Sequence, residues 1–190
     1  MRIAMIHTPL TWRGGGERQV LRLAIELEKL GHEVEIFVSA VDEEACYPNL
    51  LNKVKINVIP HPLPHSLARF KPLYKRVVKN RTKNYDYDFP CMINIGRSIP
   101  KGFDVINNHN FPTAWATFFA KKRLKIPVVW MCNEPPFWLW HAEEMELRSK
   151  ISRIIHWPLC EVFDKVSTKN IDEIVVLSLV AQELVKKSLQ

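Results

Sequence analysis

The feature that most constrains the fold is a glycine-rich loop that joins two segments of different periodicity near the amino terminus. An apolar run from Ile3 to Ile6 is typical of a buried strand. After a polar loop, three consecutive glycines, Gly14, Gly15 and Gly16, open a segment whose apolar residues recur every three or four positions. That spacing predicts a helix that ends near Gly31. The stretch is therefore expected to fold as strand, glycine-rich turn and helix.

This arrangement suits a polar or phosphate-bearing ligand. Glycine has no Cβ, so a ligand can approach the backbone closely. The unpaired N–H groups and the dipole of the first helical turn favour an anion. The sequence thus predicts a ligand site at the carboxyl end of the first strand, with a tight turn that binds nothing as the alternative. Glu17 is interpreted as a complement to the helix dipole rather than as a catalytic group.

The sequence motifs give little indication of a cofactor site or a metal site. The glycines do not form a G-x-G-x-x-G pattern, and the second expected strand, Glu33 to Ser39, does not end in the acidic residue of a dinucleotide fold. A nicotinamide site is therefore disfavoured, and we expect no cofactor. The cysteines contain no C-x-x-C pair, so a zinc site is also unexpected. They are Cys46, Cys91, Cys132 and Cys160.

Composition places the chain among soluble globular proteins. Its 190 residues, 47% hydrophobic and 25% charged, are enough for one domain with a substantial core. The apolar runs are much shorter than the ~20 residues of a spanning helix. Arg2 leads directly into a strand pattern without a signal-peptide cleavage site, so we expect a cytoplasmic location and reduced thiols.

Strand and helix patterns alternate along the rest of the chain, which predicts an α/β fold. We expect a Rossmann-like, doubly wound parallel sheet of about six strands, in the order 3-2-1-4-5-6, with helices on both faces. The further strands are expected at Val54–Ile59, Phe103–Asn107, Ile126–Cys132 and Glu173–Leu177. The further helices are expected at Ser66–Lys83, Met92–Ile99, Pro112–Lys125, Glu143–Thr168 and Val180–Leu189, and Asp42–Leu51 is a short helix or a loop.

In that order the first and fourth strands are neighbours, and the loops after them meet at the point where such folds bind ligands. His109 and Asn110 follow the fourth strand, and Glu134 follows the fifth. His109 is the main candidate for a functional group, although a lone histidine is often only a surface or core residue. His7, at the end of the first strand, is a weaker candidate.

Positive charge is concentrated in one segment. The net charge is +7, yet no Asp or Glu occurs between Asn49 and Tyr85. Ser66 to Lys83 is expected to form a basic amphipathic helix. Its basic residues either form a solvated face, bind an anionic membrane surface, or bind nucleic acid. Nucleic acid is the least favoured, because no DNA- or RNA-binding module is recognisable. The residues named for the membrane are Arg69, Lys75, Arg76 and Lys79.

Four segments resemble motifs of family 4 GT-B glycosyltransferases, in the same order and with similar spacing. They are MRIAMIHTPLTWRGGGERQVLRLAIELEKLGHEVEIF, FDVINNHN, VVWMCNEPPFWLW and DEIVVLSLVAQELVKK. The resemblance covers essentially the whole chain. It implies that residues 1–190 form a single Rossmann-like domain, the N-terminal, acceptor-side half of a GT-B architecture. The second, donor-binding Rossmann domain is expected to be a partner outside this chain.

The resemblance also implies roles for individual residues. The glycine loop would lie near the donor phosphate or the transferred sugar, and His109 would contact that sugar near the reaction centre. Glu134 and the aromatic residues after it, Trp138 among them, would shape the acceptor side. The basic helix would fit the membrane docking that is seen in relatives that glycosylate lipids.

The function expected is transfer of a sugar from a nucleotide-sugar donor to a lipid, glycan or small-molecule acceptor. The resemblance implies a retaining, metal-independent glycosyltransferase in which positioning and the donor phosphate provide much of the catalysis. Residues 1–190 alone are expected to be inactive. Two alternatives are a catalytically inactive GT-B-like binding or regulatory module, and a protein that binds the inner membrane surface peripherally through the basic helix.

Overall fold

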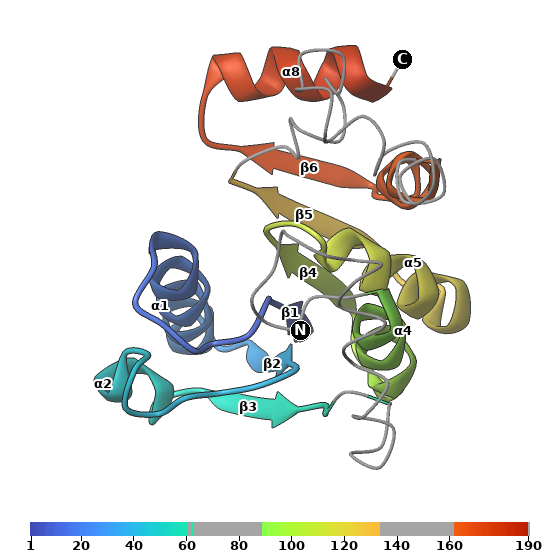
Figure 1. Ribbon diagram of the computed structural model, residues 1–190. Coiled ribbons are helices and arrows are strands. Elements are labelled where there is room, and N and C mark those ends of the chain that lie inside the picture. Colours follow the sequence, from blue (N-terminus) through green and yellow to red (C-terminus); the bar gives the residue numbers. More distant parts are fainter. Residues whose placement is uncertain (61, 63–88, 134–161, 190) are drawn as a thin grey trace, which may run out of the picture.

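Six strands form one parallel sheet in the order β3-β2-β1-β4-β5-β6 (Figure 1). The computed structural model describes residues 1–60, 62, 89–133 and 162–189. The α/β class and the strand order are those predicted from the sequence. The strands are β1 (Arg2–Ile6), β2 (Glu33–Val38), β3 (Lys55–Val58), β4 (Val105–His109), β5 (Val128–Cys132) and β6 (Glu173–Val176).

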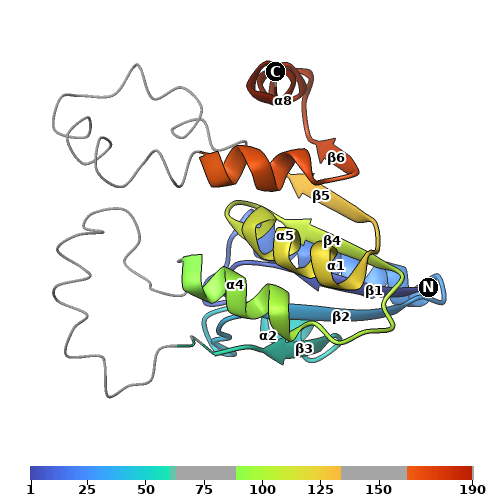
Figure 2. The same cartoon turned by 90° about the vertical axis from the view of Figure 1, so that its right-hand side faces the viewer.

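Helices cover both faces of the sheet, as expected for a doubly wound fold (Figures 1 and 2). One face carries α1 (Gly15–Lys29) and α2 (Pro48–Leu51), and the other carries α4 (Phe89–Ser98) and α5 (Thr113–Leu124). Residues 162–169 are also helical, and α8 (Leu179–Leu189) lies beyond β6 at the end of the sheet. The expected basic helix at 66–83 and the segment from 134 to 161 lie outside the described residues.

Each face of the sheet has its own apolar core, because alternate residues of a strand point to opposite faces. In β1, Ala4 and Ile6 pack with the α4 and α5 side. Ile3 and Met5 pack with the α1 and α2 side. Burial on both faces explains why the central strand β1 is a short, nearly continuous apolar run, and therefore why it could be recognised in the sequence.

The fourth strand ends two residues later than expected. The sequence predicts its end at Asn107, but β4 continues to His109, which pairs with Met131 of β5. It also begins two residues later than expected, at Val105. Just before it, Oδ2 of Asp104 accepts a hydrogen bond from the backbone N–H of Arg2 at 2.7 Å. His109 is consequently the last residue of a strand and not part of the following loop. Because Ile6 of β1 pairs with Asn108 of β4, the residues that follow them, His7 and His109, lie next to each other.

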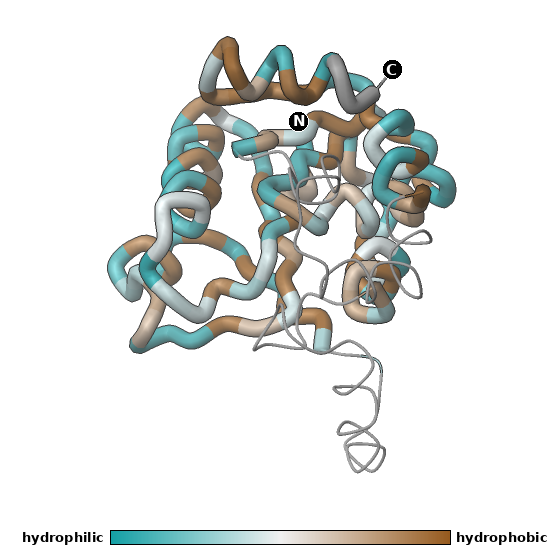
Figure 3. Tube along the Cα trace, turned by 45° about the horizontal axis from the view of Figure 1, so that its top comes forward, coloured by the Kyte–Doolittle hydropathy of each residue, from teal (hydrophilic) through white to brown (hydrophobic). Residues whose placement is uncertain are grey.

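Apolar side chains remain exposed where the sheet ends. Leu177 is 65% exposed, Leu179 79% and Val180 69%. Along α8, hydrophobic and hydrophilic residues alternate (Figure 3), and Val185 packs onto Trp130 of β5 from this helix. Among the residues that the structure describes, none of the helices has both the length and the apolar content needed to cross a bilayer.

Candidate functional site

Asn110 joins four segments at the carboxyl edge of the sheet. Its side-chain Nδ2 donates to Nε2 of His7 at 3.1 Å, which connects the end of β4 to the end of β1. Its Oδ1 accepts from Nδ2 of Asn133, just after β5, at 2.8 Å. The same Asn133 amide donates to Oε1 of Gln19 in α1 at 2.7 Å. We call His7, Gln19, His109, Asn110 and Asn133 the rim.

The backbone of Asn110 is fixed as firmly as its side chain. Its φ angle is 60°, a left-handed conformation that asparagine tolerates better than most residues. Its N–H donates to the carbonyl of Met131 at 3.2 Å. Its own carbonyl accepts from Nε1 of Trp130 at 3.2 Å and from the hydroxyl of Thr113 at 2.7 Å. The backbone that carries the side-chain amide is therefore held by β5 on one side and by the start of α5 on the other.

His7 is a neutral imidazole with a defined tautomer. Its Nδ1 lies 2.8 Å from the carbonyl oxygen of Thr8, so Nδ1 carries the proton and donates it. Nε2 is then free to accept from Asn110. The side chain is fully buried, and this burial lowers the pKa of His7 to about 4. The ring therefore carries no charge at neutral pH.

His109 is also neutral, and it keeps one acceptor atom free. Nδ2 of Asn107 donates to the carbonyl of Val129, so Oδ1 of Asn107 accepts from Nε2 of His109 at 2.8 Å. Nδ1 of His109 is left with a lone pair, and it has no hydrogen-bond partner among the described residues. Burial, followed by the nearby ring of His7, lowers the pKa of His109 to about 3.

The two rings lie side by side at the edge of the sheet. Their centroids are 6.1 Å apart and their planes are inclined by 47°. A buried acceptor without a partner costs about 1–3 kcal/mol, so Nδ1 of His109 is a place where a ligand hydroxyl would be stabilising. His109 has no exposed surface, and a ligand would have to displace what covers it.

The three glycines of the loop differ in what surrounds them. A Cβ on Gly16 would collide with the side-chain amide of Asn110, and one on Gly14 would collide with the carboxyl group of Glu17. A Cβ on Gly15 would meet nothing within 4 Å. A Cβ on Gly14 would meet only the end of the Glu17 side chain, whereas Gly16 makes room for an Asn110 amide that is held by its hydrogen bonds. Gly15, which is exposed, leaves open space at the start of α1.

Glu17 occupies the first turn of α1 and is only 4% exposed. Burial raises the pKa of its carboxyl group, against hydrogen bonds from its own N–H, from Trp12 and from the N–H of Gly14 that lower it. With Gly14 as N-cap, this is the backward contact of a capping box. Glu17 is therefore a helix cap, in agreement with its interpretation as a complement to the dipole.

The described part of the chain contains some of the predicted site residues and not others. His109, Asn110 and the three glycines come together at the edge between β1 and β4. Six other predicted site residues lie outside the described residues. They are Glu134, Trp138, Arg69, Lys75, Arg76 and Lys79.

Sequence reasoning underrated three rim residues. His7 ranked below His109, yet the two are equally buried and adjacent. Asn133 follows β5 directly, so the argument that placed Asn110 at this edge also applied to it. Gln19 lies one helical turn after Gly15, and only this spacing could have indicated it. Within the described ranges, no three His, Cys, Asp or Glu residues are grouped so that they could hold a metal ion.

Partial sequence relatives are mannosyltransferases. Alpha-1,3/1,6-mannosyltransferase ALG2 of Yarrowia lipolytica is 34% identical over 83 residues, which are 40% of this chain and 18% of the relative. The protein of the same name from Candida glabrata is 34% identical over 98 residues, 45% of this chain and 21% of the relative. The matched region therefore spans about a fifth of each relative's length.

Solved glycosyltransferase structures share the fold at low identity. The apo form of the lipopolysaccharide outer core galactosyltransferase WaaB has a TM-score of 0.54 at 12% identity, over 99% of this chain and 42% of that one. UGT73P12 of Glycyrrhiza uralensis, complexed with glycyrrhetinic acid 3-O-monoglucuronide, has a TM-score of 0.51 at 12% identity, over 100% of this chain and 47% of that one.

The sequence model of Glycosyltransferase Family 4 matches residues 13–187, which include the glycine loop, β4 and its rim residues, and β6. The fold agrees with the match, because the sheet, its strand order and the helices on both faces are those of a Rossmann-like GT-B domain. The chain belongs to Glycosyltransferase Family 4, as an N-terminal domain of the GT-B fold.

Proposed function

We propose that this chain is the acceptor-side half of a retaining glycosyltransferase that uses a nucleotide-sugar donor. The observation that carries the proposal is the rim at the β1–β4 edge. There, an unpaired buried acceptor on His109 lies near a helix start that is open at Gly15. The chain's membership of Glycosyltransferase Family 4 supports the same reaction class.

The proposed role of His109 is to position the transferred sugar. Nδ1 accepts a hydrogen bond from a sugar hydroxyl, while Asn107 holds the ring in the required tautomer through Nε2. Because the ring is neutral, it orients the sugar and does not supply charge. The role of Asn110 is to fix the relative position of the β1 and β4 ends. The first turn of α1 near Gly15 is proposed to receive the donor phosphate.

Retention of configuration and independence of a metal are part of the proposal. The hydrogen-bonded rim, as far as the structure describes it, consists of imidazoles and amides, and Glu17 is engaged as a helix cap. A front-face transfer that relies on positioning and on the donor phosphate needs no protein nucleophile. The anomeric configuration of the product, determined by NMR, and the rate in excess EDTA test these two points. An inverted product or full loss of activity in EDTA would contradict them.

Transfer requires a donor-binding domain that we propose lies outside residues 1–190. The experiment combines the chain with the donor-binding half of a Family 4 relative and follows release of nucleoside diphosphate from a panel of nucleotide sugars. Mannose donors come first, because the partial relatives are mannosyltransferases. We expect transfer by the combination and none by the chain alone. Turnover by residues 1–190 by themselves would refute the two-domain account, and donor binding without transfer would favour an inactive binding module.

Lipid, glycan and small-molecule acceptors all remain within the proposal, as does a cytoplasmic, peripheral location at the inner membrane face. The basic segment that would dock on the membrane lies outside the described residues. Sedimentation with anionic liposomes tests it, and we expect binding to weaken when Lys75, Arg76 and Lys79 are reversed in charge. Equal sedimentation of both proteins would remove the membrane from the proposal.

A further inference from the structure

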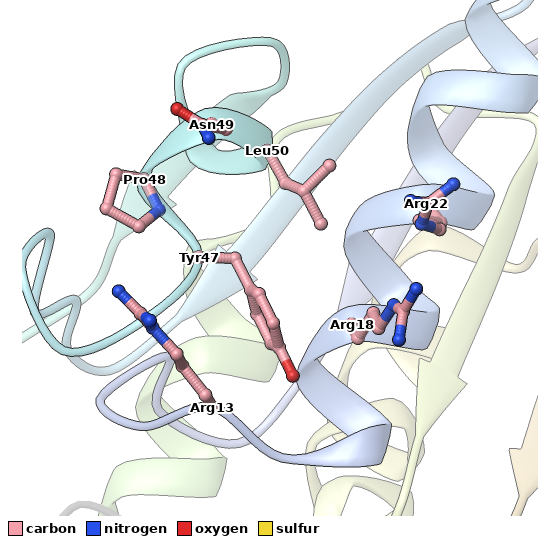
Figure 4. Close-up of a pocket in the computed structure, with 7 residues that line it drawn as sticks. All are labelled: Arg13, Arg18, Arg22, Tyr47, Pro48, Asn49 and Leu50. Carbon is pink, nitrogen blue, oxygen red and sulfur yellow. The ribbon is translucent and has the colours of Figure 1, made fainter.

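A second polar site lies beside the glycine loop, on the side away from β4. There, the loop after β1, the first half of α1 and the short helix α2 border an open pocket of about 310 Å³ (Figure 4). That volume is at the lower end of the range typical of ligand sites. The pocket is lined by Arg13, Arg18, Arg22, Tyr47, Pro48, Asn49 and Leu50.

Three cations line this pocket, and they lie on both sides of the Tyr47 ring. Arg18 and Arg22 project from successive turns of α1, and Arg13 comes from the glycine loop (Figure 4). In the part of the chain that the structure describes, none of the three forms an ion pair. Other exposed cations do, as Lys29 does with Glu26 at 2.7 Å on the same helix. The three guanidinium groups therefore remain available to an anionic ligand.

The wall opposite the arginines is attached to the glycine loop. The hydroxyl of Tyr47 donates to the carbonyl of Gly14 at 3.2 Å, and this ring stands between Arg13 and Arg18 in Figure 4. Leu51, the last residue of α2, is buried in the core that α1 covers. Pro48 and Leu50 give the pocket an apolar side. The concavity is thus held by packing and by a hydrogen bond across 33 residues of sequence.

We propose that this arginine pocket binds a diphosphate group. Guanidinium groups pair with phosphate oxygens through two parallel N–H donors, which makes arginine well suited to phosphate recognition. A phosphate monoester carries only about −1.5 to −2 charges at neutral pH, fewer than the three cations provide. A diphosphate offers more charge and more oxygens, and Pro48 and Leu50 can cover an alkyl portion attached to it. The proposal concerns binding alone, so it goes beyond the transfer reaction and does not depend on it.

Calorimetric titration of the chain with inorganic pyrophosphate tests the pocket. We expect saturable binding, tighter than for inorganic phosphate. Arg18→Gln and Arg22→Gln should each weaken pyrophosphate binding about tenfold, the loss expected for one charge-assisted hydrogen bond. The matched control is Lys122→Gln, which removes an exposed cation from α5 on the opposite face of the sheet and should change the dissociation constant less than twofold.

Several results would overturn the proposal. No saturable pyrophosphate binding would do so, and so would an equal loss in Lys122→Gln, because the effect would then be one of net charge. Binding that persists in Arg18→Gln and Arg22→Gln but is lost in Gly15→Asp would assign the anion to the α1 start instead. A short alkyl diphosphate separates two sources of the same group. Tighter binding than pyrophosphate indicates a lipid-linked diphosphate, and equal binding indicates a soluble one; either supports the site.

Discussion

The side-chain amide of Asn110 donates to Nε2 of His7 over 3.1 Å, although 103 positions separate the two residues in the sequence. The pair joins the ends of the two central strands, β1 and β4, where the strand order reverses. Since His7 donates through Nδ1 to Thr8, the bond also fixes which nitrogen of His7 faces the rim. The geometry of the candidate site therefore depends on one asparagine in a left-handed conformation.

Removing the Asn110 side chain should destabilise the domain. Asn110→Gly keeps the left-handed backbone available but leaves His7 Nε2 and one of the two N–H groups of the Asn133 amide without a partner, at a cost of about 1–3 kcal/mol. Urea unfolding measures the loss. The matched control is Lys125→Gly, which changes the other described non-glycine residue with positive φ, an exposed one at 58°. It should leave the domain as stable or more so, and an equal loss in both variants would mean that the Asn110 bonds contribute nothing.

Adjacent glycines should respond oppositely to the same added methyl group. Gly16→Ala drives a Cβ into the amide of Asn110 and should lower the melting temperature. Gly15→Ala enters open space in the first turn of a helix and should raise stability by up to about 1 kcal/mol. Thermal unfolding of the two single variants checks the order. A Gly16→Ala protein as stable as the parent would contradict the packing seen here.

Acid should begin to destabilise the fold at pH values above those at which most carboxyl groups become protonated. Burial lowers the pKa of His7 to about 4 and that of His109 to about 3, both from 6.5. The unfolded chain binds these protons below pH 6.5 and the folded chain does not. The free energy of unfolding should therefore fall from pH 6.5 toward about 4, by up to ~1.4 kcal/mol per pH unit for each histidine.

Urea titrations at several pH values give that slope. His7→Gln removes one of the two groups and should reduce the slope by about half, whatever it does to stability at neutral pH. The control is Gln182→Ala, which changes an exposed and uncharged side chain of α8 and should leave the slope unchanged. A slope unaffected by His7→Gln would mean that His7 is not a neutral buried group.

In the reconstituted two-domain enzyme, His109→Ala should reduce kcat much more than it reduces stability. Loss of one hydrogen bond to the reacting sugar corresponds to about tenfold in rate for each 1.4 kcal/mol. The comparison is Ile95→Val in the core between α4 and the sheet, which should cost about 0.5–1.5 kcal/mol in stability without lowering kcat. If His109→Ala lost folding and activity in parallel, His109 would be structural.

Most of the fold could be predicted because its strands follow a simple rule. Strands buried on both faces are short apolar runs, as β1 and β5 are, and the alternation with helices fixed the sheet order. The rule ended β4 too early, at Asn107, since Asn108 and His109 are polar and look like a loop. Burial of these residues is made possible by partners that no local pattern reveals. Asn107 donates to Val129, and Asn108 donates to Thr113.

The site was predictable to the extent that it follows from strand order. Sheet topology alone places His109, Asn110 and the glycines at one edge. It does not show that Gly16 makes room for Asn110 rather than for a ligand, because that contact joins residues far apart in the chain. The arginine pocket was missed for a similar reason. Arg18 and Arg22 resemble an ordinary solvated helix face until α2 closes a concavity over them.

The hydrogen bonds of Asn110 also have a consequence for motion. One residue ties together the ends of β1 and β4, the residue after β5 and, through Asn133, Gln19 of α1. If Asn110 lost its hydrogen bonds, all four segments would be released at once. Opening one segment alone should therefore cost nearly as much free energy as opening all four. In native-state hydrogen exchange, the amides of the rim should therefore open together, as one cooperative unit with a common free energy.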